Sequence, residues 1–231
     1  MDMYKSLKEV AWEANMEIPQ RNLAIYTWGN VSAYDEQRAV FAIKPSGVPY
    51  DQLKAEHIVV VDLEGNIVDG SLRPSSDMKT HMVLYRTFKG IGGITHTHSP
   101  YAVSWAQACR SIPVFGTTHA DHSHLSIPCT PLLDKKGVEG DYEEETGKLI
   151  VKTFNTIPYQ EQPMVLVAGH GPFAWGKNAT GSVYNAAVLE EVAKMALFTL
   201  TINPEAKSLP EHIVNKHYQR KHGPNAYYGQ K

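Results

Sequence analysis

Two histidines stand two residues apart in the stretch Thr95-His96-Thr97-His98-Ser99, after the apolar run IGGI and before the run PYAVSWAQAC. The first run predicts a strand and the second a helix from Tyr101 to Cys109. Because alternate side chains of a strand share a face, His96 and His98 could bind one metal ion. An isolated His-x-His is as often a pair of structural histidines, so a third ligand decides the interpretation.

His170 is a candidate for that third ligand, because it follows PMVLVAG, a predicted buried strand, at a strand end like that of His98. Three neutral imidazoles that leave a fourth position open to water or substrate are the donor set of a catalytic Zn²⁺ site. Asp77, at a predicted helix start, could be a further ligand or a base that substrate displaces. The pattern therefore predicts a metal site from these residues.

Three loops could bind an anion: Gly29-Asn30 in TWGN, Ser46-Gly47 in KPSG, and Ser75-Ser76 before a predicted helix. Hydroxyl groups and free backbone N–H groups at the positive end of a helix bind phosphate without many lysines. Each loop alone also fits ordinary turn and capping chemistry. Only their number favours a phosphate site.

A separate segment, from Gly171 to Lys177, has the GxxxxGK spacing of a nucleotide-binding loop between a predicted strand and a helix. Asn178 occupies the next position, where that loop needs a Ser or Thr to bind magnesium. The bulky Phe173 and Trp175 would also fill the loop. ATP binding is therefore not expected here.

The surrounding pattern predicts the elements that must position these residues. A first helix is expected to stop at Pro19, and two hairpins over 27–47 and 58–70 follow, the second turning at Glu64-Gly65-Asn66. Further helices are expected over 78–88 with a serine cap, over 143–154, over 178–200 with Asn178 as cap, and over 211–222. A short strand is expected from Ser126 to Thr130. The pattern predicts a single α/β (α+β) domain over residues 1–231, with a mainly antiparallel central sheet covered by helices.

Composition narrows the class of protein. The chain has 231 residues, is 42% hydrophobic and carries a formal net charge of -2, so it lacks the basic field that favours nucleic acid. No apolar run approaches the roughly 20 residues that span a bilayer, and the first residues do not resemble a signal peptide. We therefore expect no membrane partner and a cytoplasmic location. Cys109 and Cys129 form no disulfide framework and are interpreted as structural thiols.

Seven motifs in order along nearly the whole chain are TWGN, KPSG, PSSD, THTHS, GTTHAD, HGPFAWGK and AYYGQ. Together they resemble the zinc-dependent class II aldolase/adducin family and, within it, the L-ribulose-5-phosphate 4-epimerases. The resemblance implies a Zn²⁺ ion, or another divalent metal such as Mn²⁺, held by His96, His98 and His170 with Asp77 beside it. It implies a phosphate pocket made by the following residues: Gly29, Asn30, Ser46, Gly47, Ser75 and Ser76.

The same resemblance implies that Asp121, from GTTHAD, and Tyr228, from AYYGQ, are the acid and base, with the direction assigned to each left open. It also implies a homotetramer with active sites at subunit interfaces, in which the neighbouring subunit supplies the tail tyrosine. One departure is the sequence HSHLSIPCT after GTTHAD, where the epimerases carry aromatic residues. His122 and His124 thus form a second His-x-His, but without further ligands a solvated loop is favoured over a second metal.

The implied reaction interconverts L-ribulose 5-phosphate and D-xylulose 5-phosphate. C4 of a 2-ketopentose is β to the carbonyl, so its C–H bond is not acidified and the C3–C4 bond must open and re-form by retro-aldol and aldol steps. The alternative functions are a class II aldolase that releases its fragments and a non-catalytic adducin-like interaction domain. Asp77, where the resembling aldolases carry Glu, and the AYYGQ ending argue against the aldolase. The four candidate metal ligands argue against the interaction domain. The pathway, arabinose or ascorbate breakdown, stays open.

Overall fold

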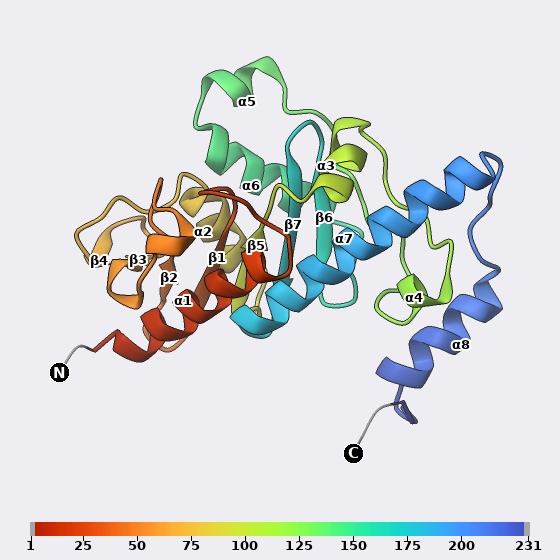
Figure 1. Ribbon diagram of the computed structural model, residues 1–231, viewed down its shortest axis with the longest axis horizontal. Coiled ribbons are helices and arrows are strands. Elements are labelled where there is room, and N and C mark those ends of the chain that lie inside the picture. The colour runs from red at the N-terminus through yellow and green to blue at the C-terminus, as the bar shows by residue number, and fades with distance from the viewer. Residues whose placement is uncertain (1–2, 229–231) are drawn as a thin grey trace.

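Side chains alternate along the strands between two apolar layers. In the computed structural model, which describes residues 3–228, Val40 and Ala42 of β2 (Val40–Ile43) face one core, while Phe41 and Ile43 face the other. Strands that are buried on both faces in this way need helices on both sides. The sheet is therefore the middle layer of three, as Figure 1 shows.

The sheet of the described chain has seven strands in the order β4-β3-β2-β1-β5-β7-β6, and every strand pair is antiparallel. Their bounds are β1 (Asn30–Asp35), β2 (Val40–Ile43), β3 (Val59–Asp62), β4 (Ile67–Asp69), β5 (Gly93–His96), β6 (Met164–Val167) and β7 (Gly171–Gly176). Two short 3-10 helices, η1 (Tyr50–Gln52) and η2 (Ala55–His57), connect β2 to β3. The prediction of one domain with a mainly antiparallel sheet is confirmed.

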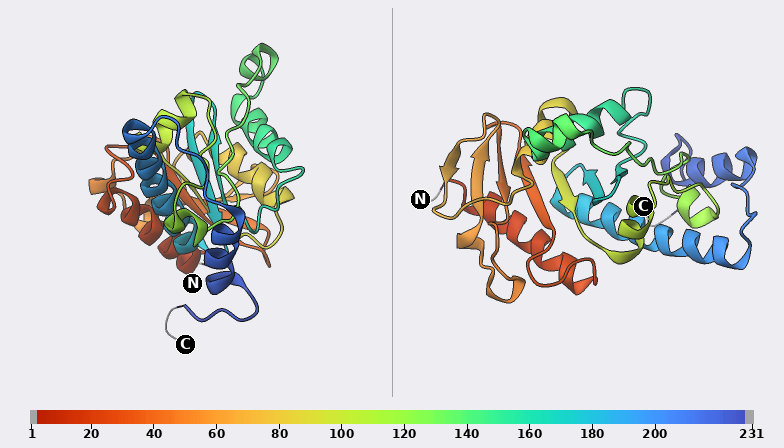
Figure 2. Two further views of the ribbon diagram at one scale, coloured as in Figure 1. Left: turned by 90° about the vertical axis from the view of Figure 1, so that its right-hand side faces the viewer. Right: turned by 90° about the horizontal axis from the view of Figure 1, so that it is seen from above.

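Helices cover both faces of this sheet (Figure 2). The apolar sides of α1 (Lys5–Gln20), α3 (Pro100–Gln107) and α7 (Ala179–Ile202) pack on one face, and those of α2 (Met78–Thr87) and α6 (Tyr142–Thr153) on the other. The short α4 (Thr117–Ala120) packs against α8 (Glu211–His222), and α5 (Lys135–Glu139) precedes α6. Between residues 3 and 228, no helix combines the length and the apolar character needed to cross a membrane.

Most predicted elements are confirmed. Both hairpins form, and the Asn178 side chain caps α7 by accepting a hydrogen bond of 2.8 Å from the Gly181 N–H. The first helix extends one residue past Pro19, and α3 ends at Gln107 rather than Cys109. Cys109 and Cys129 are free thiols.

Two element predictions are wrong. No regular strand forms from Ser126 to Thr130, where only isolated bridges join Ile127 to Ile112 and Cys129 to Leu166. Pro128 lacks the N–H group that a continuous ladder would need there. The segment interpreted as a loop before Lys177 is instead the strand β7, because Phe173 and Trp175 are fully buried in the core beneath α2 and α6.

Candidate active site

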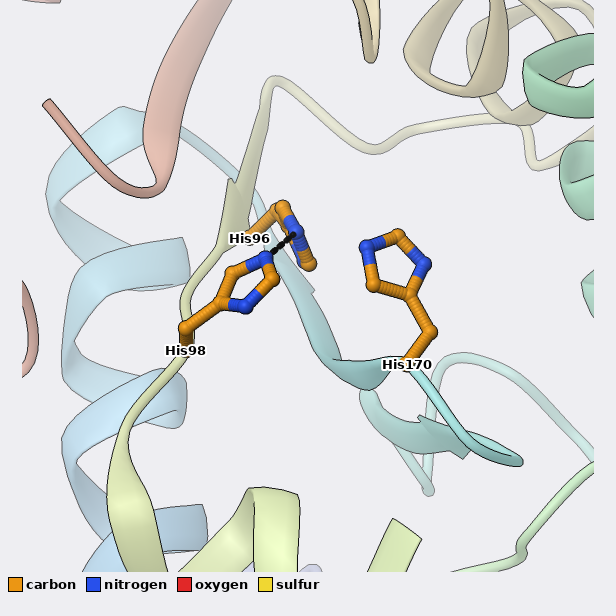
Figure 3. Close-up of side chains that lie close together, drawn as sticks. All are labelled: His96, His98 and His170. Carbon is orange, nitrogen blue, oxygen red and sulfur yellow. Dashed lines mark hydrogen bonds between the residues drawn. The ribbon is translucent and has the colours of Figure 1, made fainter. Parts of the chain in front are cut away.

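His96 is the last residue of β5, and His98 lies in the short segment between β5 and α3, which begins at Pro100. The two side chains turn toward each other, with their Nε2 atoms 3.1 Å apart (Figure 3). Two nitrogen ligands of one tetrahedral zinc ion lie about 3.3 Å apart, from Zn–N bonds of about 2.05 Å. This spacing fits two ligands of a single ion.

His170 joins them from a different part of the chain. It ends the short turn between β6 and β7, and β7 pairs with β5 so that Phe173 lies opposite His96. The His170 ring centroid lies 4.7 Å from that of His96 and 5.3 Å from that of His98. One nitrogen from each of the three rings lies within 4.8 Å of the others. The structure thus brings all three predicted histidines together.

The protonation states of these rings suit metal binding. The Nδ1 atom of His96 lies 2.9 Å from the Pro172 carbonyl oxygen, so an Nδ1–H can donate there and leave the Nε2 lone pair free. Burial, assisted by His96, lowers the pKa of His98, and it lowers that of His170 to about 4. Nδ1 of His170 is buried and has no hydrogen-bond partner between residues 3 and 228. Neutral imidazoles at His98 and His170, and a free Nε2 lone pair at His96, fit a divalent metal ion.

Asp77 lies beside the histidines, with Oδ2 4.0 Å from Nε2 of His96. It occupies the N-cap position of α2, so the prediction of a serine cap is wrong, yet its side chain caps no backbone N–H. Instead Oδ2 accepts hydrogen bonds from Asn30 Nδ2 at 2.7 Å and from Ser75 Oγ at 3.5 Å. Burial raises the pKa of Asp77, but nearby His96 and other histidines, with the Asn30 hydrogen bond, bring it below its usual value. The group is therefore a carboxylate near neutral pH.

A pocket of about 540 Å³ opens beside Asp77 and His98. All the predicted phosphate residues line it: Gly29, Asn30, Ser46, Gly47, Ser75 and Ser76. Gly29 has φ +75°, and a Cβ there would lie 2.7 Å from the His96 carbonyl oxygen, so only glycine fits between the pocket and β5. The three loops therefore form one concave site next to the histidines.

Lys44 also lines this pocket, and the sequence analysis missed it. Its side chain is almost fully buried, and its Nζ atom lies 3.4 Å from the carbonyl oxygens of Thr27 and Pro45. Burial lowers the pKa of Lys44 to about 8. The motif KPSG contains this residue, but sequence cannot show that it is buried, with no carboxylate partner in the described part of the chain. An anionic ligand in the pocket would supply the missing negative charge.

Asp121 and Tyr228 lie elsewhere in the single chain, since neither contacts the three histidines within residues 3–228. Asp121 follows α4, and its carboxylate binds Arg220 and His217 of α8. The Tyr228 ring lies under Arg220 and Lys221, while the next two residues of the AYYGQ motif fall outside the described residues. Arg220 and His217 were missed by the sequence analysis, because only the contact between α4 and α8 brings them to Asp121.

The second His-x-His does not converge on a common point. The His122 ring packs edge-on against Tyr184, and burial lowers its pKa to about 4. His124 contacts Tyr218 and lies 3.5 Å from a carboxylate oxygen of Glu161. In the described part of the chain, the cluster of His96, His98 and His170 is the one group of His, Cys, Asp or Glu arranged for a metal.

Comparisons with known proteins show the family and the fold of the chain. The model of the class II aldolase and adducin N-terminal domain matches residues 9–197. A solved L-fuculose 1-phosphate aldolase is 24% identical, with a TM-score of 0.78 over 93% of this chain and 95% of its own. YgbL from Klebsiella pneumoniae, a protein proposed to be an aldolase, epimerase or decarboxylase, is 23% identical, with a TM-score of 0.73 over 91% and 97%. The L-fuculose-1-phosphate aldolase from Thermus thermophilus is 21% identical, with a TM-score of 0.67 over 88% and 98%.

Proposed function

The chain belongs to the class II aldolase and adducin family, and on that premise we propose that it is an L-ribulose-5-phosphate 4-epimerase. The observation that carries the proposal is the placement of His96, His98 and His170 beside the pocket that contains Lys44. A ketose phosphate needs both parts, a cation for its carbonyl end and an anion site for its phosphate. The two parts adjoin through Asp77 and His98, which line the pocket.

The three histidines, with Asp77 beside them, would hold Zn²⁺ or another divalent cation such as Mn²⁺. When bound, the ion would act as a Lewis acid on the carbonyl and hydroxyl oxygens of the substrate. The chain itself supplies the orientation. The Pro172 carbonyl fixes the His96 ring, and the Asn30 amide fixes the Asp77 carboxylate.

The phosphate would lie in the pocket formed by the three loops. Ser46, Ser75 and Ser76 offer hydroxyl groups, and the Asn30 amide donates to Ser75 Oγ at 3.0 Å. Lys44 supplies a cation that has no acidic partner among residues 3–228. These contacts would hold glycolaldehyde phosphate after the C3–C4 bond breaks. Retention matters because an epimerase must turn this fragment and join it again, whereas an aldolase releases it.

Asp121 and Tyr228 would transfer the protons. As the C4 hydroxyl loses its proton, the C3–C4 electron pair moves toward the C2 carbonyl and the C4 oxygen becomes the aldehyde oxygen. Re-addition to the opposite aldehyde face returns a proton to that oxygen from the other side. One proton-transfer group on each side of the plane is therefore required, with the direction assigned to each left open.

A homotetramer with active sites between subunits is part of this proposal. Within one chain the Asp121 and Tyr228 side chains interact with α8 rather than with the histidines. A neighbouring subunit that presents α8 and its tail to the histidine site would complete it. We propose that this neighbour supplies Tyr228.

A class II sugar-phosphate aldolase is the second candidate, favoured by the names of similar structures, which include L-fuculose 1-phosphate aldolases. The short Asp77 side chain supports the epimerase instead, because the resembling aldolases carry a longer Glu that acts as a base. Asp77 is held by Asn30 and Ser75 close to His96. A non-catalytic adducin-like domain would have no need for the histidine cluster.

The decisive experiment incubates the purified, zinc-loaded protein with L-ribulose 5-phosphate and identifies the products by NMR. D-Xylulose 5-phosphate without free fragments is the expected result. Accumulation of dihydroxyacetone and glycolaldehyde phosphate, or cleavage of L-fuculose 1-phosphate at a higher kcat/KM, would identify an aldolase. Absence of turnover with either substrate would favour the interaction domain. His98→Ala is the matched control for contaminating activity.

A further inference from the structure

We infer that Arg220 is a positioning residue for both Asp121 and Tyr228, an inference that rests on the proposed function. The three residues come from two parts of the chain about a hundred positions apart, the end of α4 and the end of α8 with its tail. Figure 1 shows these segments together at one end of the molecule, beyond the sheet. Arg220 contacts both of the proposed proton-transfer residues.

The guanidinium of Arg220 binds the Asp121 carboxylate through a two-point fork. Nε donates to Oδ1 at 2.9 Å and Nη2 donates to Oδ2 at 2.5 Å. A planar fork of this kind fixes the orientation of a carboxylate as well as its charge. A lysine at this position could supply the charge but not the orientation.

The same residue holds Tyr228 in two further ways. Its guanidinium carbon lies 4.8 Å from the centroid of the Tyr228 ring, within the range of a cation–π contact. Its carbonyl oxygen accepts the backbone N–H groups of Tyr227 at 3.0 Å and of Tyr228 at 3.2 Å. The tail therefore folds back onto the end of α8 instead of extending from it, and the phenol stays beside the guanidinium that holds Asp121.

Other charged groups surround the pair. His217 lies 2.9 Å from Asp121 Oδ1, and Lys221 lies 3.9 Å from Oδ2 and 4.6 Å from the Tyr228 ring centroid. His222 contacts the Asp121 carbonyl oxygen, and His122 is the next residue in the chain. Burial raises the pKa of Asp121, but the hydrogen bonds from Arg220 and His217 and the charges of Arg220 and Lys221 bring it below its usual value. Among residues 3–228, only Arg220 combines two hydrogen bonds to the carboxylate with contact to the ring.

The test compares Arg220→Met and Arg220→Lys with Lys216→Met in the zinc-loaded full-length enzyme. Lys216 is a matched control, because it lies on the same helix with its cation 5.5 Å from the ring of Tyr227 rather than Tyr228. Arg220→Met is expected to lower kcat by about 30-fold with KM within about threefold, because the lost contacts act on the transition state. Arg220→Lys should fall between Arg220→Met and the wild type, and Lys216→Met should match the wild type. Circular dichroism and thermal unfolding of each variant verify folding.

A double-mutant cycle separates positioning from general stabilisation. If Arg220 acts through Asp121, then Arg220→Met in an Asp121→Asn background should lower kcat by less than about threefold. If the kcat losses of Arg220→Met and Asp121→Asn simply multiply in the double variant, the inference is overturned. An Arg220→Met enzyme with wild-type kcat would also overturn it.

A second measurement does not depend on activity. Carbon-13 NMR of labelled aspartate, with Asp121 assigned from the Asp121→Asn variant, follows the carboxyl titration directly. Arg220→Met should raise its midpoint by about one pH unit, and Lys216→Met should leave it unchanged. An unchanged midpoint in Arg220→Met would overturn the inference. If the wild type turns over no sugar phosphate, the proposed function fails, and this titration still decides whether Arg220 controls Asp121.

Discussion

The Nδ1 atom of His96 lies 2.9 Å from the carbonyl oxygen of Pro172, at the start of β7. This contact fixes the ring so that Nε2 faces the Nε2 atom of His98. Pro172 follows Gly171, where a Cβ would lie 3.0 Å from the Thr97 carbonyl oxygen and 3.6 Å from the His96 ring. The approach of β7 to β5 therefore both brings His170 in and orients His96.

We expect His96, His98 and His170 to bind one divalent ion. Changing any of them to Ala should lower bound metal, measured by elemental analysis, and activity together, because two remaining imidazoles hold zinc poorly. His57→Ala, which alters a histidine outside this cluster, is the control. Full metal occupancy in His170→Ala would remove that residue from the site.

Lys44 should give the pH profile of kcat/KM a basic limb, that is, a fall in kcat/KM at high pH. Because burial lowers its pKa to about 8, the free enzyme carries the Lys44 charge below that pH and loses it above. The expected result is a kcat/KM for L-ribulose 5-phosphate that falls as pH rises through about 8, since kcat/KM reports the free enzyme. Lys44→Met should be weak at all pH values and lack this limb, whereas the exposed Lys54→Met should retain it. If kcat/KM of Lys44→Met still falls as pH rises through about 8, another group causes the fall.

Tyr228 is expected to act across a subunit interface. Mixing a Tyr228→Phe chain with an inactive His96→Ala chain should then restore part of the activity, because one interface of a hybrid oligomer contains both intact halves. Mass spectrometry would show that hybrids had formed. If such hybrids stay inactive, Tyr228 serves its own subunit or has no part in the chemistry.

Deuterium labelling from solvent can test which bond breaks. If the C3–C4 bond opens, the hydrogen on C4 stays with the aldehyde fragment, so D-xylulose 5-phosphate formed in D₂O should carry no deuterium at C4. NMR of the product measures this directly. Deuterium at C4 would exclude the retro-aldol route even with the metal site correct. The same route predicts slow condensation of added glycolaldehyde phosphate and dihydroxyacetone to ketopentose phosphates.

Glu190 should stabilise the start of α3, two residues after His98. Its buried carboxylate accepts the backbone N–H groups of Tyr101 at 2.9 Å and of Ala102 at 2.8 Å. Glu190→Ala leaves both donors buried, so unfolding in denaturant should show a loss of about 3 kcal/mol. The exposed neighbour Glu191→Ala should change stability by less than about 0.5 kcal/mol. Equal losses in the two variants would contradict the capping role.

The local sequence pattern was sufficient to predict much of the fold. The alternation in the strands, the hairpin turn at Gly65 and the cap at Asn178 are properties of neighbouring residues, so each could be predicted from sequence. The strand β7 could not, because its Gly and Pro residues predict a loop. Pairing with β5 and β6 and the burial of Phe173 and Trp175 decide its conformation.

The sequence by itself determined that His96 and His98 share one face, because a period of two is built into extended backbone. Tertiary structure decided which residues meet them. His170 joins from a distant part of the chain only because β7 pairs with β5. Within the residues that the structure describes, Lys44 is buried without a carboxylate partner, and Arg220 reaches Asp121, only because distant segments pack there. Burial and long-range contact depend on the whole fold, and no local spacing encodes them.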